Sequence, residues 1–252
     1  MVRRGFTLIE LAVVVTIIAL LIAVLVPALV RVRNQAREAV CVQNLRTISL
    51  AWLMYKDDNS DNIVGGHAGR YPYDWVQSPT GDGDPIEREK EGIRQGALFI
   101  YVGDTVDVYR CPADLRGSVS VQTAFRSYSV AGGANGEGWK NSYTQARKYS
   151  ELQGPASKYV FVEQADHRES NMGSWVMNPK TGTWVDPPAV WHSGIRSSLG
   201  FADGHTEVHA WVDRSTIEMC QNPEFLHPVP ANEGQDIRFM LSGFPCKVGE
   251  GP

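Results

Sequence analysis

Residues 6–30 read FTLIELAVVVTIIALLIAVLVPALV, and this stretch decides how the chain is built. From Leu11 to Val30 there are 20 consecutive residues without a charge, and Thr16 is the only polar side chain among them. As an α-helix with a rise of about 1.5 Å per residue, this run is roughly 30 Å long, the thickness of the hydrocarbon core of a bilayer. The sequence therefore predicts one membrane-spanning helix, followed by a large soluble part.

Glu10 is an acid within this otherwise apolar stretch, and it helps to decide what kind of membrane segment this is. A secretory signal peptide has an apolar run of about 7 to 15 residues, which is shorter than the run found here. A plain membrane anchor accounts for the length but not for the carboxylate, because a charge at the centre of a bilayer helix costs about 2.5 to 3.5 kcal/mol. The acid therefore indicates a partner of opposite charge.

Charge is distributed unevenly along the 252 residues. The chain has 24 Lys and Arg against 28 Asp and Glu, which gives a formal net charge of −4. No basic excess is available to neutralise a phosphate backbone, and this argues against nucleic-acid binding. The first 57 residues carry a net charge of +4 and the remainder carries −8, as expected for an acidic soluble domain.

The first ten residues, MVRRG followed by FTLIE, resemble the processing site of type IV prepilins and type II secretion pseudopilins. In that family a membrane aspartic peptidase cuts after the glycine and N-methylates the new terminal phenylalanine. The resemblance places cleavage between Gly5 and Phe6, and it implies that Glu10 guides assembly. It also implies a single-pass inner-membrane protein, with the N-terminus cytoplasmic before processing and the C-terminal domain periplasmic or extracellular.

The charges at this end of the chain agree with the resemblance. Cleavage exposes a cationic amine on Phe6, and Glu10 of a neighbouring subunit carries the opposite charge. Each charge alone is costly in a low-dielectric helix bundle, whereas a pair compensates both. Such a pair fixes the axial register between neighbouring helices.

An amphipathic pattern follows the apolar run without a clear break. Hydrophobic residues recur at spacings of three and four on one helix face, at Leu45, Ile48, Trp52 and Tyr55. The helix is therefore predicted to continue to Asp57, with its second half packed on a sheet. Pro27 removes an internal hydrogen bond, and we expect it to bend or locally open the helix. In pilins, a proline near this place marks a stretch that melts during assembly, and the alternative is a proline that the membrane helix simply tolerates.

The remaining sequence has short β-branched or aromatic runs between Gly, Pro, Asp and Asn residues, and it predicts an antiparallel sheet with long loops. The predicted strands are Val106–Arg110, Arg126–Val130, Tyr159–Glu163 and Trp184–Val185. Residues 65–96 are predicted to be an irregular insertion with a short helix at Ile86–Arg94. We expect an α+β, pilin-like fold with a leader (1–5), a transmembrane polymerisation segment (6–30), an amphipathic stem (31–57) and a soluble β-rich domain (58–252).

The dipeptide Asp203-Gly204 predicts a β-hairpin, because it suits the two positive φ angles of a type I′ turn. Pairing across a two-residue turn sets Phe201 opposite Thr206 and Leu199 opposite Val208. One face of the hairpin is then mostly apolar. The other face carries two histidines together with small and polar residues, namely Ser198, Gly200, Ala202, His205, Glu207 and His209.

The segment from His192 to Gly204 resembles the C-terminal His–Asp-Gly motif of many large pseudopilin-like proteins. That family usually has nine residues between the histidine and the aspartate, and this chain has ten between His192 and Asp203. Further pieces of the sequence fit the same family, at Cys41–Ile48, Val108–Pro112 and Arg126–Ser129.

Four cysteines, Cys41, Cys111, Cys220 and Cys246, would all face an oxidising compartment under the implied topology. They allow three disulfide connectivities. We favour Cys41 with Cys111, which ties the stem to the sheet, and Cys220 with Cys246, which closes a C-terminal loop. No pair forms a C-x-x-C motif, and this argues against zinc or thioredoxin chemistry.

No cofactor or metal is predicted, with calcium as the alternative because type II major pseudopilins carry a calcium in a C-terminal loop. The spacing here does not match such a loop, and Asp82-Gly83-Asp84 lacks the remaining ligands of an EF-hand. The candidate ligands are His192, His205, His209, Asp203, Glu163 and Asp166. No nucleophile elbow or His-Glu-x-x-His motif is present, so catalysis is not expected.

The favoured function is a pseudopilin that polymerises through its N-terminal helix into a periplasmic filament of a type II secretion-like system. Its implied partners are the prepilin peptidase, other pseudopilin subunits and an inner-membrane assembly platform. A type IV pilin subunit is the near alternative. A membrane-tethered module that binds carbohydrate or another ligand, and that merely uses the prepilin export route, is the alternative from another class, and a membrane-anchored hydrolase is a third. Polymerisation requires Glu10 and the continuous stem, whereas a tethered binder or enzyme does not.

Overall fold

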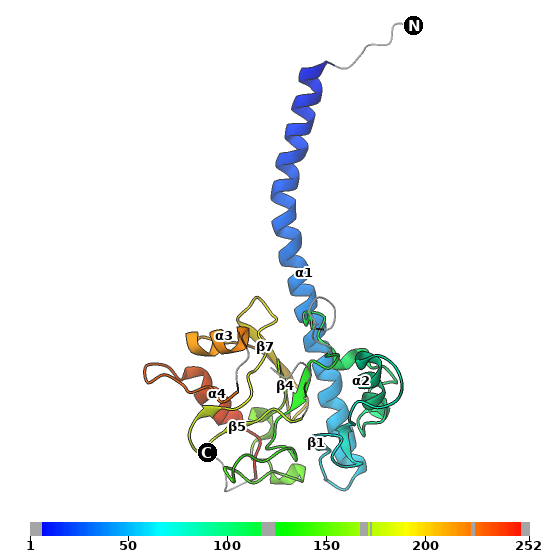
Figure 1. Cartoon of the computed structure of the whole chain (residues 1–252), viewed down its shortest axis with the longest axis vertical. Coiled ribbons are helices and arrows are strands. Elements are labelled where there is room, and N and C mark those ends of the chain that lie inside the picture. The colour runs from blue at the N-terminus through cyan, green and yellow to red at the C-terminus, as the bar shows by residue number, and fades with distance from the viewer. Residues whose placement is uncertain (1–6, 117–123, 167–170, 172, 223–224, 248–252) are drawn as a thin grey trace.

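One long helix, α1, covers Leu8–Asp58 in the computed structural model, which describes residues 7–116, 124–166, 171, 173–222 and 225–247. At the usual rise its 51 residues extend over about 76 Å. The N-terminal half stands clear of the rest of the chain (Figure 1), and its large apolar side chains are exposed from Leu8 to Val32. Cys41 is the first buried residue of α1 and marks where the helix enters the domain. The predicted long helix is confirmed.

Pro27 lies inside α1 without interrupting it. Proline cannot donate a main-chain hydrogen bond, so the carbonyl of Ala23 loses its helical partner there. The residues on both sides nevertheless keep a helical conformation, and the helix is continuous in Figure 1. α1 is therefore not interrupted at Pro27 in the single chain, whereas the bend and the melting during assembly stay predictions.

The principal sheet is antiparallel, with the strand order β3-β4-β7-β8. Its strands are β3 (Tyr128–Val130), β4 (Tyr159–Glu163), β7 (Arg196–Phe201) and β8 (Thr206–Ala210). The strand predicted at Tyr159–Glu163 is confirmed with its bounds, and the one predicted at Arg126–Val130 forms over its last three residues. A small antiparallel pair joins β5 (Met177–Asn178) to β6 (Thr183–Trp184), where a strand was predicted at Trp184–Val185.

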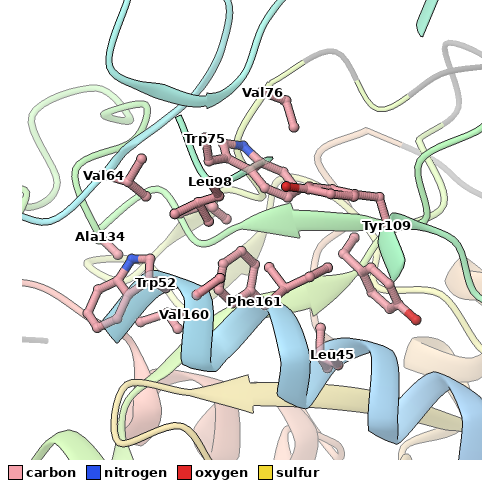
Figure 2. Close-up of a cluster of buried hydrophobic side chains, with 14 of the residues drawn as sticks. Leu45, Trp52, Val64, Trp75, Val76, Leu98, Tyr109, Ala134, Val160 and Phe161 are labelled. Carbon is pink, nitrogen blue, oxygen red and sulfur yellow. The ribbon is translucent and has the colours of Figure 1, made fainter. Parts of the chain in front are cut away.

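The sheet separates two apolar cores. On one face, Leu45, Ile48 and Trp52 of α1 pack with Phe161 of β4, as Figure 2 shows for Leu45, Trp52 and Phe161. On the other face, the sheet packs against α3 (Arg214–Gln221) and α4 (Gln235–Gly243). Five of the seven tryptophans are buried in these cores, at Trp52, Trp75, Trp175, Trp184 and Trp211. The tryptophans are therefore mainly core residues.

Gly200 sets the distance between α1 and the sheet. A Cβ atom at this position of β7 would lie 2.4 Å from Oγ of Ser49 and 3.2 Å from Cγ of Leu45. Any larger residue would push the helix away from the strand. Side chains of the stem therefore pack directly on the backbone of β7.

Residues 65–96 are more regular than the sequence suggested. They form a parallel pair of short strands, β1 (Gly65–Ala68) and β2 (Asp74–Val76), followed by α2 (Pro85–Arg94). The side chain of Asp84 caps α2 by accepting hydrogen bonds from the backbone N–H groups of Ile86 and Glu87. The predicted helix is confirmed. The segment expected to be irregular instead contains two paired strands and this helix, beside the end of α1.

The strand predicted at Val106–Arg110 is wrong. The segment is a 3-10 turn, Asp107–Tyr109, in which the N–H of Tyr109 donates to the carbonyl of Val106. The carbonyl of Arg110 accepts a hydrogen bond from Asn44 Nδ2 of α1 at 2.9 Å, and the ring of Tyr109 is buried against Trp75. These contacts with distant residues override the local β-propensity.

Candidate functional site

The N-terminal end of α1 is closed by Thr7 and Glu10. The Thr7 backbone N–H donates to Glu10 Oε2 at 2.9 Å, and the Thr7 hydroxyl donates to the same oxygen at 2.8 Å. The Glu10 N–H in turn donates to Thr7 Oγ1 at 3.3 Å, which completes a capping box. The predicted processing residues, Gly5 and Phe6, lie outside the described residues.

Glu10 is also the only ionisable side chain between Leu8 and Val30. It is exposed in the single chain, like the apolar residues that surround it. This helix is long and apolar enough to cross a membrane, and among the described segments it is the one that meets this condition. The single chain thus presents one carboxylate within an uncovered apolar helix, and its described partners are the backbone N–H and the hydroxyl of Thr7.

A second polar group, Glu163 and His192, is buried beneath the stem. His192 Nε2 lies 3.0 Å from Oε1 of Glu163, which is at the end of β4, and both side chains are buried. The other carboxylate oxygen of Glu163 accepts a hydrogen bond from the N–H of Ser198 in β7 at 2.9 Å. Glu163 therefore connects the two central strands of the sheet and holds the motif histidine against them.

The surroundings of this pair change the pKa values of both side chains. Burial opposes the charged form of His192, but the hydrogen bond and the charge of Glu163 outweigh it and raise the pKa of His192. Burial also raises the pKa of Glu163, against the opposing effect of His192. Both shifts favour retention of protons by the folded protein.

We expect the contribution of this pair to the stability of the domain to fall as the pH rises. A histidine with a raised folded pKa contributes stability that is complete below its unfolded pKa, about 6.5, and that disappears as the pH passes its folded pKa. Each unit of difference between the two pKa values is worth about 1.4 kcal/mol. Denaturant unfolding of the full chain in detergent micelles at pH 5.5 and pH 8.5 should show this loss.

The His192→Gln variant provides the comparison for that measurement. It should be less stable than the parent at pH 5.5, and the difference should shrink at pH 8.5. Glu163→Gln should reduce the pH dependence as well, because it removes the charge that raises the pKa of His192. An identical pH dependence in the parent protein and in His192→Gln would contradict the assigned coupling.

A disulfide between Cys41 and Cys111 lies beside this pair. Cys111 Sγ is 3.6 Å from His192 Nε2, and the ligand atoms of Cys41, Cys111, Glu163 and His192 lie within 4.8 Å of one another. The two sulfurs are bonded to each other and are not available as thiolates. In the oxidised protein this cluster is therefore a covalent tie between the stem and the domain, supported by a buried acid–histidine pair.

The second disulfide that was expected, Cys220 with Cys246, is not formed. Both residues are buried in the apolar core on the far side of the sheet. Cys220 lies near the end of α3, where burial raises the pKa of its thiol. The backbone of Cys246 forms an antiparallel bridge with Gln145 instead. Sharing one core does not bring these two sulfurs to bonding distance.

The predicted hairpin is present, but its register differs by one residue. The N–H of Gly204 donates to the carbonyl of Phe201, and Gly204 has a φ of +90°. The loop therefore has three residues and ends in a glycine bulge, instead of the two-residue type I′ turn that was expected. Gly200 lies opposite Thr206, and Leu199 lies opposite Glu207.

The candidate metal ligands do not form one cluster in the described part of the chain. His205 contacts Asp203, lies 3.3 Å from Glu207, and stacks on Phe201. His209 lies 3.8 Å from an oxygen of Asp236. His192 contacts Glu163 instead of Asp203. The six residues proposed as one set, His192, His205, His209, Asp203, Glu163 and Asp166, thus contribute to separate places in the described part of the chain.

The fold and the N-terminal segment together define a pilin-like protein, in which a long, half-exposed apolar helix is packed on an antiparallel sheet. Residues 1–26 match the family model of the prokaryotic N-terminal methylation motif. The chain therefore carries a prepilin-type N-terminus, as the resemblance of its first ten residues implied.

Two relatives match part of the chain. Over 90 aligned residues the chain is 35% identical to the Type II secretion system core protein G of Pseudomonas aeruginosa. The aligned region covers 36% of this chain and 61% of that protein. Over 57 aligned residues it is 44% identical to the Type IV wide pilus major component PilA4 of Thermus thermophilus. The aligned region covers 23% of this chain and 44% of that protein. The chain thus spans less than two thirds of either relative. No solved structure matches it significantly.

Proposed function

We propose that this chain is a subunit of a membrane-anchored filament, and specifically a pseudopilin of a type II secretion-like system. The observation that carries the proposal is the exposed apolar half of α1 with Glu10 as its only ionisable group. A charged side chain on a lipid-facing helix is costly, and a cation on a neighbouring helix compensates that cost. The methylation motif supplies such a cation as the amine of Phe6 after cleavage.

The proposed partners follow from this mechanism. A prepilin peptidase cuts after Gly5, an inner-membrane platform raises each subunit, and other subunits supply the helices that cover the apolar surface. The relationship to protein G favours a secretion filament, and the relationship to the wide-pilus component supports a surface type IV pilus as the second candidate. Deletion of the protein separates the two, since loss of secreted proteins indicates the first and loss of surface fibres indicates the second.

Mass spectrometry and cross-linking test the proposal directly. The mature protein purified from its host should begin at an N-methylated Phe6. A photo-reactive residue at Val14, on the exposed part of α1, should give a ladder of cross-linked subunits in cells. The Gly5→Leu variant is the matched control, because its uncut chain should give no ladder. A mature protein that retains residues 1–5, or that stays monomeric with a correct N-terminus, would exclude filament assembly by this route.

A further inference from the structure

A cavity of about 530 Å³ lies beside the C-terminal end of α1. Its walls come from that end of the helix, from β1 and the turn after it, and from the loops around residues 135 and 145. In Figure 1, β1 and the end of α1 lie at the opposite end of the molecule from the N-terminus. The volume falls within the usual range for small-molecule sites, and the cavity is separate from Glu10 and from His192.

One wall of the cavity is aromatic. The rings of Tyr71 and Tyr73 are stacked with centroids 5.1 Å apart and planes within 2°, and the residues are 37% and 46% exposed. The buried Asp74 holds their turn, because its Oδ2 accepts hydrogen bonds from the N–H groups of Arg70 and Tyr71, each at 2.7 Å. His67 packs edge-on against Tyr71. The guanidinium of Arg70 lies over the ring of Tyr71, 5.4 Å from its centroid, so this cation adjoins the aromatic wall, and both tyrosines remain partly exposed to solvent.

The polar groups of the cavity are cations and amides. Arg70 and Arg147 are exposed, and in the described part of the chain neither forms an ion pair with a carboxylate. The lining includes the amide side chains of Asn62, Asn135 and Gln145, and no lining residue is acidic. Guanidinium groups bind carboxylates through paired hydrogen bonds, and amides both donate to and accept from hydroxyl groups.

We propose that this cavity binds an acidic saccharide, whose apolar ring face lies on the tyrosine wall and whose carboxylate lies between the two arginines. The aromatic wall fits the C–H face of a sugar ring, and the amides fit its hydroxyl groups. A neutral sugar would leave the arginines unused, and an acidic peptide would leave the tyrosine wall unused. The site does not require filament assembly, so its test is independent of the function proposed above.

Isothermal titration of the full chain, in a detergent without sugar head groups, tests the proposal. The probes are a galacturonic acid trisaccharide, the corresponding neutral galactose trisaccharide and a triglutamate peptide. We expect the acidic trisaccharide to bind about tenfold or more tightly than either of the others, because only it contacts both the tyrosine wall and the two arginines. This order should persist at 0.15 M salt, where long-range attraction between surface charges is screened.

Variants at exposed positions identify the site. The double variant Arg70→Gln and Arg147→Gln should weaken binding of the acidic trisaccharide about tenfold or more, and Tyr73→Ala should weaken binding of both trisaccharides. Arg238→Gln is the matched control on α4 and should bind like the parent. Equal binding of triglutamate, no binding of the acidic trisaccharide at millimolar concentration, or binding that these variants leave unchanged would overturn the proposal. Unchanged thermal unfolding of each variant shows that the fold is intact.

Discussion

The Glu10→Leu variant should insert into the membrane and be cleaved after Gly5, but it should assemble almost no filament. Removal of one member of a buried ion pair costs about 3 to 5 kcal/mol, because the remaining charge is left unpaired in a low-dielectric environment. A loss of 3 kcal/mol alone weakens association between subunits more than 100-fold. Filament yield in sheared or detergent-extracted material, normalised to the cleaved subunit, measures the effect.

Two controls separate pairing between subunits from the local role of Glu10. Glu10 also closes the capping box with Thr7, so its loss removes one half of the cap at the start of the helix. Thr7→Val breaks the same box but keeps the acid, and it should assemble far better than Glu10→Leu. Thr16→Leu removes a polar group from the same apolar helix and should assemble normally. Normal filament yield from Glu10→Leu would remove this residue from the mechanism.

Loss of the Cys41–Cys111 disulfide should produce the largest change in stability. The bond joins residues separated by 70 positions, and the chain-entropy model gives about 4 kcal/mol for a loop of this length. The double variant Cys41→Ala and Cys111→Ala should therefore unfold about 10 °C or more below the parent protein. Thermal unfolding of the oxidised full chain in detergent micelles measures the difference.

A reducing agent provides the internal check on this prediction. Dithiothreitol should lower the unfolding temperature of the parent protein toward that of the double variant, and it should leave the double variant unchanged. Cys220→Ala removes a buried thiol that is not part of a disulfide, so its effect should be small and independent of reductant. Peptide mapping that finds Cys41 and Cys111 as free thiols in the oxidised protein would contradict the bond.

Local patterns in the sequence were sufficient for the parts of the fold that depend on neighbouring residues. The apolar run and the spacing of Leu45, Ile48 and Trp52 predicted α1, because helix faces repeat at a fixed interval. The run of β-branched and aromatic residues at Tyr159–Glu163 predicted β4. Asp84 followed by Pro85 marks the start of α2, because an acidic N-cap and a proline in the first turn are both local signals for the start of a helix.

Contacts between distant residues explain what the sequence did not reveal. The register of the hairpin depends on the positive φ of Gly204, and this one angle moves His205 to the face of Phe201. Both Glu163 and His192 were among the candidate ligands, but their pairing depends on how β4 meets the start of β7. An even number of cysteines likewise gives no information on the distances between their sulfur atoms. It therefore could not show that Cys41 and Cys111 are bonded while Cys220 and Cys246 are not.

The candidate cavity was the least predictable feature. The stacked Tyr71 and Tyr73 lie in residues 65–96, which the glycine, proline and acidic content marked as an irregular insertion. The signal that could have drawn attention is the Arg70-Tyr71-Pro72-Tyr73 sequence, which places two aromatic residues and a cation in one short turn. Their common orientation depends on the buried Asp74, whose role is visible only when the turn is folded around it.

The position of the Cys41–Cys111 bond has a mechanical consequence. Tension applied along the anchored end of α1 passes the ion pair between Glu38 and Arg196 of β7 and then reaches Cys41, where the helix becomes buried. If only non-covalent contacts held the helix at that point, they would break one after another under load. The Cys41–Cys111 disulfide instead transmits the load through a covalent bond. A subunit that is pushed or dragged from its base would then move as one rigid body, and its distal surfaces would keep their shape under strain.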